Sequence, residues 1–464
     1  MTTDTIRVEV IETSSLGDRS YLATDGESAV VVDPQRDVDR VLALAGRLGV
    51  EITHVVETHI HNDYVSGGLE LSRLTGADYG VAADDDVPFR RTPLSDGDTV
   101  EISGGMRLRV VATPGHTFHH LSYVLEGTGG AEGVFTGGSL LFGTTGRTDL
   151  LGKEHAEKLA HHQHASALRL ADVLPDGASI WPTHGFGSFC TAAPAATDDS
   201  TLGQEKQTNP ALRLAAEEFV TEALAGLDAY PAYYVHMGVA NLAGPEPVDL
   251  RFPGHADPDE LRRRLEKGEW VVDLRHRTAY VRSHLAGTVS LGLDGPMPTW
   301  LGWMIDWGAP LTLLGESPDQ VARAQRELVR IGIDRIEAAA SGSPEDLAAD
   351  PGQVRGLDSA DFADLAAILS DGTEDPARQR EVVLDVRLNN EWNTSHIAGA
   401  VHIPLPEVAR RIDEVPPGRV WVHCGSGYRA AAAASLLDGA GRDVVLVDDF
   451  FANAAPSGVP MAEV

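Results

Sequence analysis

Cysteine is almost absent from this chain of 464 residues, which has only Cys190 and Cys424. A single pair of cysteines so far apart is a poor candidate for a disulfide in a reducing compartment, so at least one is expected to have a chemical role. No segment approaches the ~18 consecutive apolar residues of a membrane-spanning helix, and the first residues lack a basic segment followed by an apolar one. The sequence therefore predicts a cytoplasmic protein with no membrane partner.

Positive charge is also in short supply. The chain has 37 Lys and Arg residues against 69 Asp and Glu residues, which gives a formal net charge of -32. Such a surface repels polyanions, so nucleic acid is not expected as a partner. An anionic small substrate would need arginines placed locally at its site. The sequence leaves open whether the chain forms a homo-oligomer.

The chain is too long for one hydrophobic core, and at roughly 150 residues per domain it is expected to hold about three. In the first part, short apolar strands such as residues 28–33, 53–58 and 107–112 alternate with helical patterns. This alternation predicts an α/β layered domain whose sites lie in loops at strand ends.

Two later segments resemble each other. Glu-Trp-Val-Val-Asp-Leu-Arg at 269–275 is followed by His-Leu-Ala-Gly at 284–287, and Glu-Val-Val-Leu-Asp-Val-Arg at 381–387 is followed by His-Ile-Ala-Gly at 396–399. The offset is 112 residues in both pairs, which indicates a duplicated domain. We therefore expect three domains, over residues 1–245, 246–345 and 360–464.

In the second copy a cysteine lies between a predicted strand and a predicted helix. Cys424-Gly-Ser-Gly-Tyr-Arg429 joins strand 419–423 to the alanine-rich helix 430–437. Backbone N–H groups and the helix dipole at such a junction favour a thiolate, and glycines let the loop amides converge on the sulfur. The loop suits a thiolate that carries an extra sulfur atom. We predict Cys424 and Arg429 as catalytic residues, and the following as substrate-binding: Gly425, Ser426, Gly427 and Tyr428.

This loop and the preceding motifs, Asp385-Val-Arg387 and His396-Ile-Ala-Gly399, resemble the rhodanese family of thiosulfate sulfurtransferases. The resemblance implies that Cys424 carries sulfur as a persulfide and that thiosulfate or sulfite is a substrate. A phosphatase loop would need five residues between cysteine and arginine, and this loop has four. The first copy has Leu313-Leu-Gly-Glu-Ser317 where the cysteine loop belongs, so we expect it to be an inactive structural or docking domain.

Histidines follow several predicted strands in the first domain. They stand in Thr58-His59-Ile-His61-Asn-Asp63-Tyr64, in Thr113-Pro-Gly-His116 and in Pro182-Thr-His184. Two histidines and an aspartate at alternate positions, with two isolated histidines after other strands, are how a metal centre is assembled from loop ends. The pattern therefore predicts a metal site.

The histidine pattern resembles the metallo-β-lactamase superfamily, which includes glyoxalase II and the persulfide dioxygenases. The segment Gly143-Thr-Thr-Gly-Arg147-Thr-Asp149 is similar to one in the persulfide dioxygenases, and the domain order is that of persulfide dioxygenase–rhodanese fusion proteins. The resemblance implies an αββα sandwich followed by two rhodanese-like α/β domains. It also implies one Fe(II), held by two histidines and one aspartate, that serves the oxidation of a low-molecular-weight thiol persulfide to sulfite by O₂.

Two positions depart from the family pattern. Gly138 stands where the aspartate ligand is expected, and Tyr64 stands where two-metal hydrolases have a histidine. Carried over onto this chain, the ligands are His59 and His116, and His61 could complete a three-histidine set that suits Fe(II) or Zn²⁺. The remaining candidate ligands are Asp63 and His184.

Two further residues of the first domain are candidates for substrate contact. Arg147 could bind the anionic part of the substrate or form a salt bridge to Asp149. Cys190, six residues after His184, could relay sulfur or be a buried apolar thiol.

Three functions fit these patterns. The first is a persulfide dioxygenase and sulfurtransferase, with small thiol persulfides, thiosulfate and sulfite as its partners. The second is a sulfurtransferase alone, whose N-terminal domain binds a persulfide without oxidising it. The third is a one-zinc thioester hydrolase of the glyoxalase II type. The sequence does not reveal which thiol carries the sulfur.

Overall fold

The computed structural model describes residues 6–191, 197–370 and 380–463. The chain forms two compact units, Met1–Asp249 with Val329–Gly332 and Leu250–Leu328 with Ile333–Val464. Residues 1–5, on which the expectation about a targeting segment rests, lie outside the described residues. Within the described ranges, no helix combines the length and the apolar character needed to cross a membrane.

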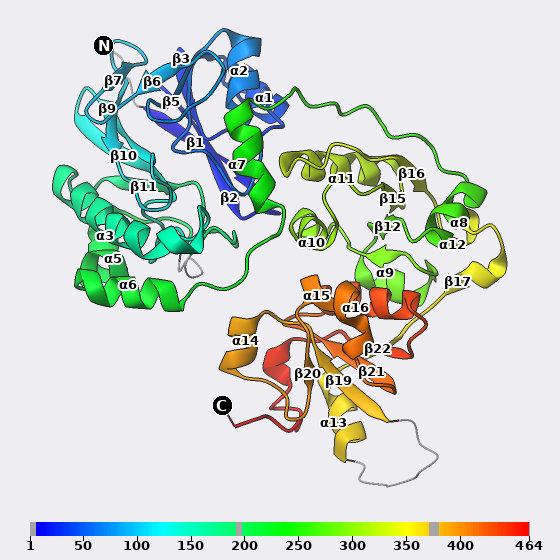
Figure 1. Ribbon diagram of the computed structural model, residues 1–464. Coiled ribbons are helices and arrows are strands. Elements are labelled where there is room, and N and C mark those ends of the chain that lie inside the picture. Colours follow the sequence, from blue (N-terminus) through cyan, green and yellow to red (C-terminus); the bar gives the residue numbers. More distant parts are fainter. Residues whose placement is uncertain (1–5, 192–196, 371–379, 464) are drawn as a thin grey trace. The chain divides into compact units, whose positions relative to one another are not determined.

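The first unit contains two sheets (Figure 1). One has six strands in sequence order: β1 (Arg7–Thr13), β2 (Asp18–Thr24), β3 (Ser28–Val32), β4 (Glu51–Val56), β5 (Asp78–Ala82) and β6 (Thr92–Leu94). β1, β2 and β3 pair antiparallel, whereas β3 to β6 pair parallel. Parallel pairing requires crossovers, and two of these contain helices: α1 (Asp39–Leu48) and α2 (Gly68–Thr75).

The other sheet has the order β11-β10-β9-β8-β7. Its strands are β7 (Thr99–Glu101), β8 (Arg107–Ala112), β9 (Leu121–Gly127), β10 (Gly130–Gly137) and β11 (Ser179–Pro182). β10 and β11 are parallel and are joined by α3 (Ala156–Val173); the other pairs are antiparallel. The unit is completed by α4 (Leu202–Thr208), α5 (Pro210–Arg213), α6 (Ala216–Ala225) and α7 (Tyr234–Ala243).

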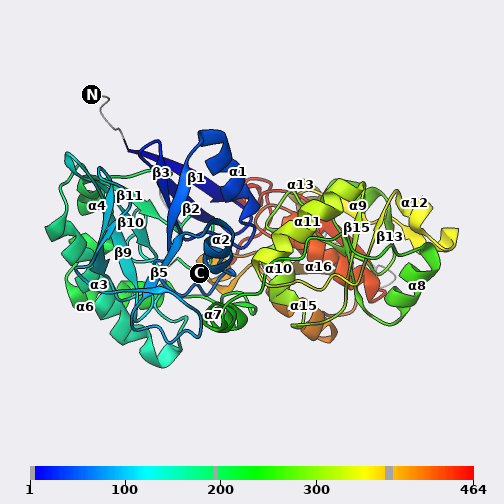
Figure 2. The same cartoon turned by 90° about the horizontal axis from the view of Figure 1, so that it is seen from above.

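The two sheets pack face to face. Tyr21 and Val32 of the first sheet and Tyr123 of the second belong to one buried core. A separate cluster joins the second sheet to α3 and α6, for example through Val124 and Phe219, and another joins the first sheet to α1 and α2. Figures 1 and 2 show these helices on the outer faces of the sheets. The arrangement is a four-layer αββα sandwich, which confirms the expected fold class.

The histidine-bearing loops begin where strands of both sheets end. β4 leads into His59, β8 into His116 and β11 into His184. Asp33, directly after β3, has a φ of 51°, and its carboxylate accepts hydrogen bonds from the Thr58 amide at 2.6 Å and hydroxyl at 2.7 Å. These contacts tie the end of β3 to the end of β4 and fix the start of the first histidine segment.

The second unit contains both copies of the repeat. The first copy has a parallel sheet of order β14-β12-β15-β16, with β12 (Trp270–Asp273), β14 (Val289–Ser290), β15 (Leu311–Gly315) and β16 (Ala338–Ser341). β13 (His284–Leu285) and β17 (Val354–Arg355) form a small antiparallel pair. Its helices are α8 (Pro258–Glu266), α9 (Arg277–Arg282), α10 (Met297–Met304), α11 (Pro318–Arg330) and α12 (Pro344–Leu347).

The second copy repeats this topology. Its parallel sheet has the order β18-β22-β21-β19-β20, with β18 (Asp358–Ala360), β19 (Glu381–Asp385), β20 (Val401–His402), β21 (Arg419–His423) and β22 (Val444–Val447). The order β20-β19-β21-β22 matches β14-β12-β15-β16 of the first copy. Its helices are α13 (Phe362–Ser370), α14 (Asn389–Thr394), α15 (Leu405–Arg411) and α16 (Tyr428–Gly439).

The repeated motifs also make the same contacts. Arg275 pairs with Asp273 in the first copy and Arg387 with Asp385 in the second, each with a shortest N–O distance of 2.6 Å. Each arginine also donates to a serine carbonyl oxygen eight residues further on. The sequence repeat is therefore a structural repeat. The predicted boundary between residues 345 and 360 falls inside the second unit and stays a prediction.

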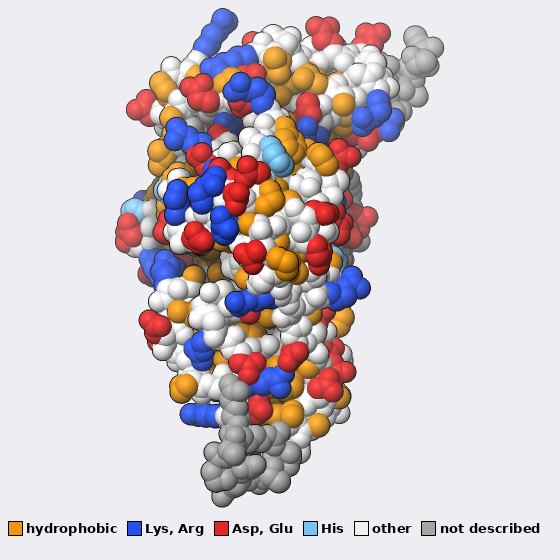
Figure 3. Space-filling model, turned by 90° about the vertical axis from the view of Figure 1, so that its right-hand side faces the viewer, with side chains coloured by type: hydrophobic (Ala, Val, Ile, Leu, Met, Phe, Trp, Pro, Cys, Tyr) orange, Lys and Arg blue, Asp and Glu red, His pale blue; other side chains and the backbone are white. Residues whose placement is uncertain are grey.

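Charged side chains of both signs are scattered over the face of the molecule that Figure 3 shows. Acidic residues outnumber basic ones in the whole chain, 69 against 37. Arginines that could bind an anionic substrate must therefore be sought at the sites themselves.

Candidate functional site

Three histidines from three loops meet in the first unit. The Nε2 atoms of His59 and His184 lie 3.4 Å apart, and the ring centroids of His59 and His116 lie 4.8 Å apart. One ring nitrogen of each of the three lies within 4.8 Å of the others, and all three residues are buried. Three imidazoles at this spacing can share one metal ion.

The second nitrogen of each ring is held by an oxygen atom. These oxygens are Thr58 Oγ1 at 2.9 Å for His59, the Arg147 carbonyl at 2.8 Å for His116, and Asp18 Oδ1 at 2.9 Å for His184. A carbonyl or a carboxylate can only accept, so Nδ1 of His116 and His184 must donate. Thr58 Oγ1 donates its own hydrogen to Asp33, so it accepts from His59. Each Nδ1 is thus fixed as the protonated nitrogen, which leaves Nε2 as the metal-binding atom.

His116 gives a direct test of whether the residues fit a metal. Its Nε2 is buried and has no hydrogen-bond partner, a costly state for a polar atom unless something binds there. Burial and the charge of His184 lower the pKa of His116 to about 3. A neutral imidazole with an unpaired, inward-facing nitrogen fits a metal ligand, so the three-histidine set fits one metal ion.

His61 points elsewhere. Its Nε2 lies 3.3 Å from Asp33 Oδ1 and 3.3 Å from Glu57 Oε2, and 3.0 Å from the Tyr64 hydroxyl. Burial would lower the pKa of His61, but the two carboxylates outweigh it and raise that pKa to about 9. Its Nε2 is thus taken up by two carboxylates, whereas one ring nitrogen of His184 lies within 4.8 Å of those of His59 and His116. The structure therefore brings His184, in place of His61, together with His59 and His116.

Asp63 and Tyr64 lie behind the three histidines. Asp63 Oδ2 is 3.1 Å from His184 Nδ1, and Asp18 accepts from the same nitrogen. Burial would lower the pKa of His184, but Asp63 and Asp18 raise it to about 10. The Tyr64 ring stacks on His61 with a centroid distance of 4.3 Å. Asp63 thus lies behind His184, where its negative charge can balance the positive charge of a metal ion bound to that histidine.

Gly138 lies against the His116 ring. A Cβ atom built on Gly138 would overlap the carbon atoms of that imidazole, and one built on Gly146 would lie 2.6 Å from its Nδ1. The His116 ring is therefore held between two glycine backbones. An aspartate at 138 would not fit beside His116 unless one of them moved. The His116 ring can occupy this position because residue 138 has no side chain.

Arg147 is fully engaged within the protein. It forms a two-pronged pair with Asp149, at 2.7 and 2.9 Å, and donates to the carbonyl oxygens of Phe189 and Asp228. Its side chain is only 4% exposed, and the guanidinium lies 4.6 Å from the Tyr230 ring centroid. Of the two roles that the sequence leaves open for Arg147, the salt bridge to Asp149 is present.

Cys190 is buried near the same histidines. The Arg147 amide donates to its carbonyl oxygen at 2.8 Å. Burial and the nearby carboxylates of Asp63 and Asp18 raise the pKa of the Cys190 thiol well above its usual value. In this environment the neutral thiol is strongly favoured, and the role of Cys190 in sulfur relay stays a prediction.

The loop Cys424–Arg429 lies at the end of β21, where the sequence predicts it. Cys424 is buried, and α16 begins at Tyr428. Gly427 has a φ of 89°, a left-handed conformation that other residues adopt at a cost. The Gly425 carbonyl accepts from the Phe451 amide at 3.0 Å, which holds the loop to the segment after β22.

Arg429 is paired with a residue that the sequence reasoning missed. Its two terminal nitrogens donate to Glu391 at 2.5 and 2.7 Å. Burial would raise the pKa of Glu391, but Arg429 outweighs burial and lowers it. Glu391 lies in α14, between the two framing motifs, and no local sequence signal marks it as a partner. The pair fixes how Arg429 faces the loop.

His423, directly before the cysteine, was also missed. It is buried, stacks on Phe451 with a centroid distance of 5.5 Å, and neither ring nitrogen has a hydrogen-bond partner. Burial lowers its pKa to about 4 against the opposing effect of Asp385. His423 is therefore neutral near pH 7.

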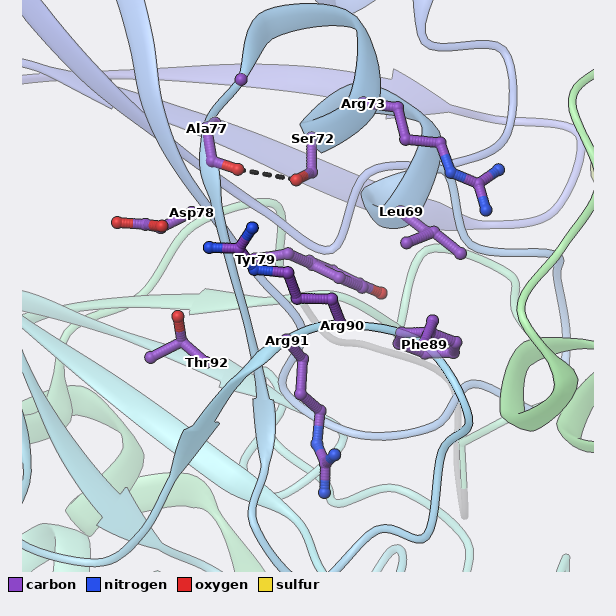
Figure 4. Close-up of a pocket in the computed structure, with 11 residues that line it drawn as sticks. Leu69, Ser72, Arg73, Ala77, Asp78, Tyr79, Phe89, Arg90, Arg91 and Thr92 are labelled. Carbon is purple, nitrogen blue, oxygen red and sulfur yellow. Dashed lines mark hydrogen bonds between the residues drawn. The ribbon is translucent and has the colours of Figure 1, made fainter.

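A cavity of about 550 Å³ opens elsewhere in the first unit, between α2, β5 and the segment before β6. Figure 4 shows its lining residues, among them Tyr79, Phe89 and Arg91. Arg91 is used structurally, because it donates to the carbonyl oxygens of Ala83 and Asp85. None of the three clustered histidines lines this cavity, so we do not assign it to the metal centre.

Comparison with known proteins gives matches to both parts of the chain. The Metallo-beta-lactamase superfamily matches residues 18–186, and the Rhodanese-like domain matches residues 363–454. A crystal structure of a metallo-beta-lactamase from Staphylococcus aureus superposes with a TM-score of 0.65 at 29% identity, covering 73% of this chain and 99% of that one.

Two kinds of enzyme are similar to part of this chain. Human mitochondrial persulfide dioxygenase ETHE1 is 31% identical over 246 residues, which cover 51% of this chain and 82% of the relative. A hydroxyacylglutathione hydrolase of Gloeobacter violaceus is 34% identical over 202 residues, which cover 40% of this chain and 79% of the relative.

Proposed function

Because this chain belongs to the metallo-beta-lactamase superfamily and carries a rhodanese-like domain, we propose that it oxidises a low-molecular-weight thiol persulfide to sulfite and moves sulfane sulfur through Cys424. The observation that carries the proposal is the set of three histidines whose Nε2 atoms converge while each Nδ1 is held by an oxygen. The similarity to a persulfide dioxygenase supports the choice of substrate.

His59, His116 and His184 would hold one Fe(II), and the bound ion would supply the chemistry that activates O₂. A set of three histidines lacks the negative charge of a carboxylate ligand. In this chain two carboxyl groups lie one step back, Asp18 and Asp63 behind His184, and Asp63 carries the charge, because burial and Asp63 raise the pKa of Asp18 to about 7. A carboxylate that accepts from a ligand histidine raises its basicity, so these two residues would compensate for Gly138.

The overall reaction is balanced with water as a reactant. One persulfide, one O₂ and one water give one thiol, one sulfite and two protons. The product sulfite is then an acceptor for the second centre. The Cys424 persulfide would give its outer sulfur to sulfite, forming thiosulfate and restoring the thiolate.

In the second unit, Cys424 is the nucleophile of the proposed transfer. Its thiolate would attack the outer sulfur of thiosulfate, the S–S bond would break, and sulfite would leave with the electron pair. The loop amides and the start of α16 would stabilise the negative charge. Arg429 is held in place for this by Glu391.

Thioester hydrolysis is a second candidate, favoured by the similarity to a hydroxyacylglutathione hydrolase. A two-metal form would need a further set of ligands, and His61, Asp63 and His184 are close enough to one another to provide it. Against this, His61 is taken up by Asp33 and Glu57. We therefore place persulfide oxidation first.

The test is oxygen uptake by the Cys424→Ser variant, purified without oxygen, loaded with Fe(II) and supplied with glutathione persulfide. The variant silences the cysteine centre, so uptake belongs to the first unit. The control is the double variant Cys424→Ser/His116→Ala, which measures oxidation by free iron. We expect uptake with sulfite formation well above this control. Uptake no greater than the control would contradict the proposal, and hydrolysis of a glutathione thioester by the same protein would favour the second candidate.

A further inference from the structure

The cysteine-less first copy contacts the Cys424 loop of the second copy directly. The Tyr428 hydroxyl donates to the Gly292 carbonyl at 2.8 Å, and a Cβ atom on Gly295 would overlap the Tyr428 ring. The Arg429 guanidinium lies 5.5 Å from the ring centroid of Trp300, in α10. These three contacts come from a copy that has no cysteine of its own. The first copy therefore forms part of the surroundings of the loop.

Arg277 is the charged residue that the first copy brings to this place. Its Nε donates to Asp448 Oδ1 at 2.7 Å and its Nη1 to Asp294 Oδ2 at 3.1 Å. A Cβ atom on Gly427 would overlap Asp448 and lie 3.1 Å from Arg277 Nε. The ion pair of Arg277 and Asp448 thus packs directly against the backbone of the cysteine loop at Gly427, which leaves no space for a side chain at that position.

One nitrogen of Arg277 remains available. Among the residues that the structure describes, its two carboxylate partners take Nε and Nη1 and leave Nη2 without a hydrogen bond. The side chain is 23% exposed, so solvent or a solute can reach it. By contrast, both terminal nitrogens of Arg429 donate to Glu391. Arg429 keeps further N–H donors of its own, but its side chain is only 14% exposed, so Arg277 is the more accessible of the two cations.

The repeat gives independent support. Position 277 corresponds to Asn389 in the second copy at the offset of 112 residues. The first copy thus has a positive charge where the second copy has a neutral side chain. Burial would lower the pKa of Arg277, but Asp448, Asp294 and the charge of Cys424 outweigh it and raise that pKa. Arg277 thus lies close enough to Cys424 for their charges to interact.

We propose that Arg277 is a specificity-determining residue of the Cys424 centre, which binds the anionic end of sulfur donors that carry a sulfonate-type group, such as thiosulfate. The cysteine-less copy is then the substrate-binding half of the centre. The inference rests on the proposed sulfurtransferase function. While the Cys424 thiolate attacks the outer sulfur of thiosulfate, Arg277 holds the oxygens of the sulfite that leaves with the electron pair.

Two variants separate charge recognition from a purely structural role. Arg277→Gln removes the cation, and Asp448→Asn keeps the cation but frees it from its partner. We expect Arg277→Gln to raise KM for thiosulfate about tenfold, the effect of losing one charged contact of about 1.4 kcal/mol, with a smaller change in kcat. Asp448→Asn should leave KM unchanged or lower it. Arg277→Lys should restore part of the loss. The control is Arg262→Gln, which removes an exposed cation of α8.

A second measurement does not depend on turnover. Iodoacetate and iodoacetamide alkylate the same thiol, but only iodoacetate is an anion, and mass spectrometry of the Cys424 peptide gives each rate. Arg277→Gln should slow iodoacetate more than iodoacetamide. Equal slowing of both reagents, or the same change in Asp448→Asn as in Arg277→Gln, would overturn the proposal. If wild-type protein transfers no sulfur from thiosulfate, the function fails, while the ratio of alkylation rates still decides the role of Arg277.

Discussion

The two candidate centres of this chain are built in opposite ways. The histidine centre collects His59, His116 and His184 from three loops that follow strands of two different sheets. The cysteine centre is one six-residue segment, Cys424–Arg429, that runs from the end of β21 into the first turn of α16. In the first, each histidine is oriented by an oxygen that accepts from its Nδ1, which comes from the adjacent Thr58 for His59 and from distant parts of the chain for His116 and His184. The second is one continuous segment whose backbone turn depends on Gly427, which has a φ of 89°.

This difference determines how each centre responds to change. In the histidine centre, side chains are packed so closely that a new atom must displace an old one, as at Gly138. In the cysteine centre the backbone carries the geometry, and neighbours such as Glu391 and Asp385 set the electrostatics. Substitutions that add atoms should therefore reduce the activity of the histidine centre most. Substitutions that change charge should reduce the activity of the cysteine centre most.

The largest effect is expected for Cys424, the proposed nucleophile. Cys424→Ser should lower sulfur transfer from thiosulfate to cyanide by about 10³-fold or more, because a hydroxyl does not form the persulfide. Formation of thiocyanate measures this, and Cys190→Ser serves as the matched control, since the Cys190 thiol is buried and held neutral. Transfer that persists in Cys424→Ser and disappears in Cys190→Ser would reverse the assignment.

The next effect concerns the glycine in the histidine centre. Gly138→Asp restores the family's carboxylate, yet it should bind Fe(II) more weakly than wild type, because its side chain must displace His116. Such overpacking costs about 1–3 kcal/mol, which corresponds to a fall in affinity of roughly tenfold or more. Metal titration under anaerobic conditions measures it.

Gly138→Ala is the control for this experiment. It carries the same first side-chain atom without the carboxylate, so the steric account predicts a similar loss in both variants. Tighter binding by Gly138→Asp than by wild type would show that the loop adapts and that the carboxylate becomes a ligand.

The smallest effect is a pH dependence in the cysteine centre. His423 has a pKa of about 4 in the folded chain, below its ordinary value of about 6.5. The unfolded chain therefore takes up a proton on His423 first as pH falls. Its contribution to stability is complete above pH 6.5 and is lost between about pH 6.5 and 4, by at most about 3 kcal/mol. His423→Phe, which would pack on Phe451, should show a flatter dependence of Tm on pH over this range.

Calorimetry of the full chain between pH 4 and 7 would follow this effect, with the exposed His255→Gln as control. That control should retain the wild-type pH dependence. A slope in His423→Phe equal to that of wild type would mean that His423 is not the group responsible.

The sequence predicted the cysteine centre better than the histidine centre, for a physical reason. Cys424, the glycines and Arg429 lie within six consecutive residues, so their arrangement follows from the strand and helix on either side. Glu391 could not be predicted, because it reaches Arg429 from α14, 38 residues away in sequence. Alternating strands and helices predicted an α/β layered first domain, the resemblance to a known family implied its αββα form, and the repeat at 112 residues predicted the duplicated domain.

In the histidine centre, spacing identified the residues but not the directions of their side chains. His61 stands two residues after His59, so the two were expected to act together. The direction of His61 is set by Asp33 and Glu57, which hold its Nε2. His184 takes the place beside His59 and His116 because Asp18 orients it from β2. None of these three carboxylate contacts has a signature in the local sequence.

The most direct test of the three-histidine centre compares two variants, His184→Gln and His61→Gln, in which the same substitution is made at two buried histidines. Each is loaded with Fe(II) without oxygen, separated by size to keep only folded chains, and analysed for metal by mass spectrometry. We expect about one metal ion per chain in wild type, as three histidines hold a single ion, a similar content in His61→Gln, and little metal in His184→Gln. Metal retained by His184→Gln and lost from His61→Gln would contradict the account.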